Sequence, residues 1–321
     1  IRAATIEPLD FDQYLLLTYK KLPPTSQQNL FVVLQELIQE QPNNPYFHMA
    51  TAQIAAQNEA ITVAEQLVAQ SLKLKPNFTH AIQLQAKLIR YQTNEDLPAL
   101  QYLHTAITKN PNDEELRIFY SNALLDNNNV KEALPYLQQL TKSKVYGMEA
   151  QFTLGELLLE QRQYKKAHAM LIQVIQDPIY GAAAKYNLGQ LCEYQNNTKA
   201  AVKWYAEIKD GQLHIPATLK AVTLLAADGS YKQALQLIQE ATPMTFIEQK
   251  QLLLTELDLL LATEEAERAM KLINDALTLV PTDLDFLYSR SILASILQQP
   301  NQAEQDLQTI LSIDPEHANA L

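Results

Sequence analysis

Residues 187–205 read NLGQLCEYQNNTKAAVKWY, and residues 152–171 read FTLGELLLEQRQYKKAHAML. Both segments contain a Leu-Gly pair followed by an alanine, with Gly155 and Ala167 in one and Gly189 and Ala201 in the other. Each pair of equivalent residues is displaced by 34 positions. A fixed displacement of this size indicates an internal repeat, which is typical of stacked-repeat proteins.

The same alanine recurs through most of the chain. Consecutive copies are separated by 35, 34, 34, 34, 33, 35 and 34 residues, and they are Ala64, Ala99, Ala133, Ala167, Ala201, Ala234, Ala269 and Ala303. A proline follows many of these alanines by about twelve residues, as at Pro76, Pro111, Pro178, Pro281 and Pro315. Asn or Asp commonly comes next, as in Pro42-Asn43-Asn44, Pro76-Asn77 and Pro111-Asn112-Asp113. These side chains are expected to accept the free N–H groups of a new helix.

The apolar residues of each unit form two separate stripes, and each stripe has the spacing of one helix face. Within residues 182–213, Leu188, Gly189 and Cys192 form one apolar stripe. Ala201, Tyr205 and Ile208 form a second stripe after a polar break at residues 195–198. This pattern predicts two helices joined by a turn. Small residues are expected where the two helices cross, because closely packed axes leave no space for a long side chain.

These features resemble the tetratricopeptide repeat (TPR). The 34-residue period, the Leu-Gly of the first helix, the alanine of the second helix and the terminal proline carry the resemblance over residues 42–315. It implies an all-α, right-handed superhelical TPR solenoid of antiparallel helix pairs. Most units lack the large aromatic residue that the family has early in the first helix, and two lack the terminal proline.

The repeat predicts the domain organisation. Residues 1–41 are expected to form a degenerate helix pair that caps or continues the array, and residues 316–321 the start of a further helix in a truncated chain. The eight predicted units between them are 42–76, 77–111, 112–145, 146–179, 180–213, 214–246, 247–281 and 282–315.

Composition and charge exclude several classes of function. The net charge is −11, and residues 240–321 carry −10 of it, so we expect no nucleic-acid binding. The single cysteine, Cys192, excludes an intramolecular disulfide, and no apolar run is long enough to cross a membrane. Catalytic and nucleotide-binding motifs are lacking and the six histidines are scattered. We therefore predict a protein that is not an enzyme, with no catalytic residue, metal or cofactor.

A protein-binding surface is the remaining candidate site. By resemblance, the fifth and ninth residues of each unit face a concave groove formed by the first helices. No unit pairs, at these two positions, the lysine and the asparagine with which chaperone-binding members hold a carboxylate. The predicted partner-binding residues are Ile118, Asn122, Phe152, Glu156, Tyr186, Gln190, Leu219, Leu254, Asp258 and Tyr288. Alternatively, neighbouring helices cover the apolar members. Nearby acidic residues favour a partner segment that carries Lys or Arg.

Residues 180–321 resemble a narrower group, the TPR lipoproteins of the proteobacterial outer membrane. That resemblance implies a periplasmic, outer-membrane-anchored adaptor that presents peptidoglycan-cleaving endopeptidases to a carboxyl-terminal processing protease. Its lipid-bearing cysteine would lie upstream of Ile1. The other interpretation is a cytoplasmic assembly or regulatory scaffold whose activity lies in a domain outside this segment.

Overall fold

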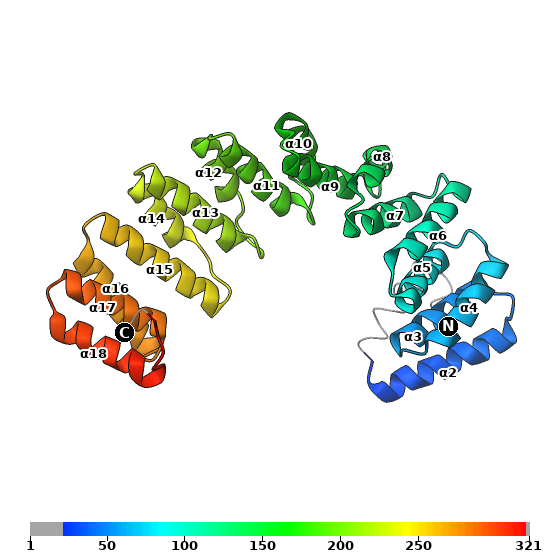
Figure 1. Ribbon diagram of the computed structural model, residues 1–321, viewed down its shortest axis with the longest axis horizontal. Helices are drawn as coiled ribbons and strands as arrows, with labels where there is room; N and C mark the ends of the chain where they lie inside the picture. The colour runs from blue at the N-terminus through cyan, green and yellow to red at the C-terminus, as the bar shows by residue number, and fades with distance from the viewer. Residues whose placement is uncertain (1–21, 319–321) are drawn as a thin grey trace. The chain divides into compact units, whose positions relative to one another are not determined.

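The computed structural model describes residues 22–318, along which the chain forms seventeen helices and no strand (Figure 1). The all-α prediction is confirmed. The first of these helices is α2 (Pro24–Glu40), and the remaining sixteen form eight pairs. The first helices of the pairs are α3 (Pro45–Gln57), α5 (Thr79–Thr93), α7 (Glu114–Asp126), α9 (Gly147–Glu160), α11 (Gly181–Tyr194), α13 (His214–Ala227), α15 (Phe246–Ala262) and α17 (Leu284–Ile296). The second helices are α4 (Ile61–Leu74), α6 (Asp96–Lys109), α8 (Val130–Leu140), α10 (Tyr164–Leu171), α12 (Thr198–Ala206), α14 (Tyr231–Glu240), α16 (Ala266–Leu279) and α18 (Pro300–Ile313).

The helices group into two compact units, Ile1–Leu154 and Gly155–Leu321. Each of the eight predicted repeat segments contains one helix pair. Of the expected N-terminal pair, residues 1–21 lie outside the described part of the chain, and α2 covers most of the rest. In the segment where the start of a further helix was expected, residues 316–318 are not helical, and residues 319–321 lie outside the described residues.

The repeating alanines lie where the two helices of a pair meet. Each is the fourth residue of its second helix, and none is more than 7% exposed. Each glycine of the opening segments faces the residue four positions after the alanine in the same helix pair. A methyl group added at Gly155 would lie 2.6 Å from the Leu171 side chain, and one added at Gly189 would lie 2.5 Å from the Tyr205 ring. Small residues therefore permit the close approach of the helices.

The turn between the two helices of each pair contains a residue in the left-handed backbone region. This residue lies five positions before the repeating alanine in all eight pairs. Gly229 is the only glycine among them, and the others are Glu59, Asn94, Asn128, Arg162, Asn196, Glu264 and Gln298, with φ between 52° and 62°. An L-residue with a side chain is disfavoured in this conformation, so these turns hold backbone strain.

The polar residues that follow the prolines cap some helices but not all. Asn44 accepts from the backbone N–H of Tyr46 at 3.1 Å, and Asp113 accepts from that of Leu116 at 2.9 Å. At α5, however, the residue before the helix is Phe78, which has no side-chain cap. Phe78 is buried and contributes instead to an apolar cluster with Met49 and Ala81. The expectation that Asn77 caps this helix was wrong, because Phe78, which packs into the apolar cluster, occupies the N-cap position.

Candidate protein-binding surface

In the second unit, first helices α11, α13 and α15 lie along one side, and second helices α12 and α14 lie along the other (Figure 1). First helices α13 and α15 also touch directly. Residues at i and i+4 share one face of a helix, so the fifth and ninth positions of each repeat form one row. We call this row in the second unit the first-helix face; its members are Glu156, Tyr186, Gln190, Leu219, Leu254, Asp258 and Tyr288.

In the first unit, the predicted residues differ in how accessible they are. Ile118 is only 5% exposed, so the alternative expectation, that neighbouring helices cover the side chain, applies to this residue. Asn122 is half-buried, and its amide donates to Glu149 Oε1 at 3.0 Å. Phe152 is also half-buried. A partner in this unit would therefore contact Asn122 and Phe152 but not Ile118.

The apolar members of the first-helix face are half-exposed and rest on the interior. The ring of Tyr186 lies 5.3 Å from that of buried Tyr205. Leu219 packs on the cluster that contains Ile215 and Val222. Leu254 and Tyr288 pack on the neighbouring cluster around Leu257 and Phe286. Each side chain is thus held in place from below while part of it stays accessible, which is the arrangement expected of an interface anchor.

Two carboxylates on this face have no ion pair within the described residues. Glu156 is half-buried and accepts an amide hydrogen bond from Asn187 at 3.1 Å. Burial raises the pKa of the Glu156 carboxyl, and the neighbouring charge of Glu160 acts in the same direction. Asp258 is exposed, and partial burial of its carboxyl raises its pKa as well. In both cases the folded chain disfavours the charged form.

Two other carboxylates of the first helices, Glu193 and Glu115, are compensated within the chain. Glu193 accepts from the Tyr205 hydroxyl and lies 3.6 Å from the Lys220 ammonium. Glu115, in the first unit, lies 2.9 Å from His80 Nε2 and 3.2 Å from the Gln83 amide. Burial alone would raise the pKa of Glu115, but the hydrogen bond and charge of His80 together with Gln83 bring it below the ordinary value.

Sequence reasoning missed two cavities. One of about 170 Å³ lies among α5, α6 and α7, with Leu100, Leu103 and Phe119 in its wall and Lys87 and Asn122 at its rim. A second of about 240 Å³ lies between α9, α10 and α11, beside the stacked rings of Tyr164 and Tyr194, and includes Gln190. The sequence predicts neither cavity. It predicts only Asn122 and Gln190, one in each cavity lining, from their positions in the repeat.

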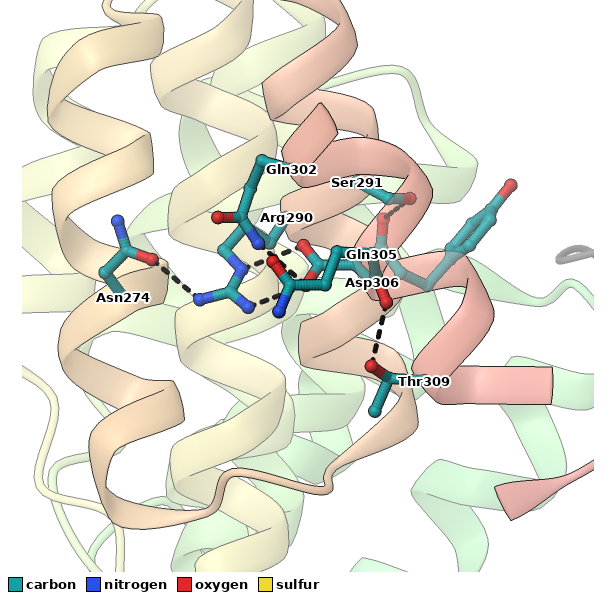
Figure 2. A network of polar contacts seen from close by, with 8 residues as sticks. Asn274, Arg290, Ser291, Gln302, Gln305, Asp306 and Thr309 are labelled. Carbon is teal, nitrogen blue, oxygen red and sulfur yellow. Dashed lines mark hydrogen bonds and ion pairs between the residues drawn. The ribbon is translucent and has the colours of Figure 1, made fainter. Parts of the chain in front are cut away.

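The last repeat contains a buried polar network that has a structural role (Figure 2). The Arg290 guanidinium donates to both carboxylate oxygens of Asp306, at 2.6 and 2.8 Å, and to Asn274 Oδ1 at 3.0 Å. Gln302 adds a donor to Asp306 at 3.1 Å. Asp306 is 1% exposed, so this network links α16, α17 and α18 and is not available to a partner.

No reactive constellation emerges from the part of the chain that the structure describes. Within residues 22–318 there is no group of three His, Cys, Asp or Glu side chains placed to hold a metal ion. Cys192 is 7% exposed, as its place in the first-helix stripe predicts, and burial raises the pKa of its thiol. In the same range, no helix combines the length and apolar character that crossing a bilayer requires.

Comparison with known proteins agrees with this geometry. Two tetratricopeptide-repeat family models match, at residues 99–145 and 152–212. The TPR repeat-containing protein PA4667 of Pseudomonas aeruginosa is 32% identical over 129 residues, which cover 40% of this chain and 22% of that protein. This chain thus matches about a fifth of the length of that relative.

Solved structures with a similar chain path have low sequence identity to this chain. The human IFIT1 dimer with PPP-AAAA is 12% identical, with a TM-score of 0.45 over 89% of this chain and 68% of that one. YrrB, described as a TPR protein with an unusual peptide-binding site, is 16% identical, with a TM-score of 0.38 over 68% of this chain and 95% of that one. The helix pairs and the matched segments show that the chain has the all-α fold of a tetratricopeptide-repeat protein.

Proposed function

We propose that this chain is a non-enzymatic adaptor that holds extended segments of partner proteins on its first helices. Tetratricopeptide repeats are typically protein-binding scaffolds, which supports the general class. The observation that carries the proposal is the first-helix face, where half-exposed Tyr186, Leu219, Leu254 and Tyr288 share a row with two carboxylates that have no ion pair within the described residues. Apolar and aromatic side chains that are anchored in this way, with polar residues around them, are typical of interfaces.

We further propose that the adaptor works in the bacterial envelope. Its partners would be a carboxyl-terminal processing protease and peptidoglycan-cleaving endopeptidases, and a lipid anchor would hold it at the outer membrane on the periplasmic side. The resemblance of residues 180–321 to outer-membrane TPR lipoproteins supports this assignment, and the identity with the Pseudomonas aeruginosa protein is compatible with it. Fractionation of cells that express the protein with its natural flanking sequence tests the location. Recovery from the cytoplasm would contradict it.

Site-specific photo-crosslinking tests the binding surface. Thr223 and Ile292 are exposed ninth-position residues on α13 and α17, so a photoreactive residue can replace either without filling the interior. Lys203 and Lys232, which are exposed on second helices α12 and α14, are the matched controls. We expect partner proteins to be captured from Thr223 and Ile292 but not from the controls. Equal capture from all four positions would contradict the assignment.

A further inference from the structure

We infer, on the basis of the proposed function, that the segment bound by the second unit is extended and carries two basic side chains about eight residues apart. These side chains pair with Glu156 and Asp258, and apolar residues between them contact Tyr186 and Leu219.

Charge compensation within the chain is the first step. Three of the four basic residues on α11, α13, α15 and α17 already have carboxylate partners. Lys220 lies 3.6 Å from Glu193, Lys250 lies 2.8 Å from Asp283, and Arg290 lies 2.6 Å from Asp306. The fourth, Lys185, has no ion pair within the described residues, and neither do Glu156 and Asp258.

The environment of the two carboxylates indicates the sign of the charge that the bound segment carries. Glu156 accepts only a neutral amide from Asn187, and Asp258 accepts no hydrogen bond within the described residues. A carboxylate that is partly removed from water without a cation is unfavourable, and a partner's ammonium or guanidinium group would correct this. An acidic partner segment would add a third negative charge to the same row and is disfavoured.

The spacing of the two carboxylates gives the length of the segment. Both occupy the ninth position of a repeat, Glu156 on α9 and Asp258 on α15, so they are three first helices apart. At the spacing of about 8–10 Å that packed helices have, three such steps separate the two carboxylates by about 24–30 Å. An extended chain covers about 3.3 Å per residue, so this distance corresponds to about seven to nine residues. Tyr186 on α11 and Leu219 on α13 lie between the ends.

Selection from a displayed library of random peptides, about sixteen residues long so that they exceed the required span, tests the inference. Peptides selected on the wild-type chain should be enriched in pairs of Lys or Arg about eight positions apart. Glu156→Gln and Asp258→Asn should each weaken the selected peptides roughly fivefold, whereas Glu207→Gln, an exposed position on the second-helix side, should not. Peptides without paired basic residues, or peptides insensitive to Glu156→Gln and Asp258→Asn, would overturn the inference.

The same variants separate this inference from the proposed function. Peptides that crosslink to Thr223 but bind equally well to the two neutral variants would leave the first-helix face as the binding surface and remove only the charge assignment. Peptides that crosslink only to a photoreactive residue at position 203 or 232 would contradict both the binding surface and the charge assignment.

In the absence of peptide, both neutral variants should melt at a higher temperature than wild type, because burial disfavours the charged carboxylates.

Discussion

The Arg290–Asp306 pair provides a quantitative test of what holds the last repeat together. The Asp306 side chain is 2% exposed and that of Arg290 is 20% exposed, so the two partners are not equally able to reach water. In Arg290→Met, Asp306 would remain buried with Gln302 as its only side-chain donor. Removal of one partner of a buried ion pair costs about 3–5 kcal/mol, since the other charge is left uncompensated. In Asp306→Leu, Arg290 would keep Asn274 and partial access to water, so we expect a smaller cost of about 1–2 kcal/mol.

The double variant should be much more stable than the sum of the single effects predicts. Replacing both partners by apolar residues of similar size removes the desolvation of both charges, and we expect stability within about 1 kcal/mol of wild type. Native-state hydrogen exchange of α17 and α18 is the appropriate assay, because a repeat array loses structure locally. The reasoning would be refuted if Arg290→Met cost less than Asp306→Leu, or if the two single effects were additive.

Three further predictions concern the crossing, the turns and pH. Gly189→Ala should destabilise α11 and α12 by about 1–3 kcal/mol, because its methyl group meets the Tyr205 ring, and unchanged hydrogen exchange there would contradict this. Glu264→Gly should raise the stability of the α15–α16 pair by about 1 kcal/mol by relieving the left-handed backbone, measured by urea denaturation; a loss of stability would contradict it. The pKa of Glu115 is lowered in the fold, so its contribution is present above the ordinary pKa of 4.5 and is lost as the pH falls through the folded value. Glu115→Gln should therefore reduce the loss of stability on acidification below about pH 4.5, and an unchanged pH profile would contradict this.

The fold was predictable because its decisive contacts are local in sequence. The crossing of two helices in one pair requires a small residue at a fixed position, and this requirement produces the regular spacing of Ala167 and Ala201. The turn between them leaves a weaker signal. A glycine at the left-handed position appears only at Gly229, while Arg162 and Glu264 adopt the same backbone without any compositional cue. Packing of the flanking helices imposes that conformation, so the sequence pattern alone does not show it.

For the proposed binding surface, the sequence predicts the position of each residue in the repeat but not how accessible its side chain is. The repeat assigns Ile118 and Leu219 to equivalent positions, yet Ile118 is buried and Leu219 is half-exposed. The difference depends on the side chains of adjacent repeats, which vary from one repeat to the next. Similarly, no local pattern shows that Glu193 has Lys220 as a partner while Glu156 has only an amide. Charge compensation is a property of neighbouring helices and had to be read from the structure.

This difference in compensation separates the structural carboxylate Asp306 from Glu156 and Asp258, which we propose to be functional. Asp306 is almost fully buried and has a bidentate arginine, so its charge is used within the fold. Glu156 and Asp258 are more accessible and lack a cation, so their charges reduce stability in the free chain. Residues that reduce stability without a compensating contact are expected at functional sites. A bound basic segment would supply the missing cations, and binding would then stabilise the repeats from α9 to α15 more than those that follow.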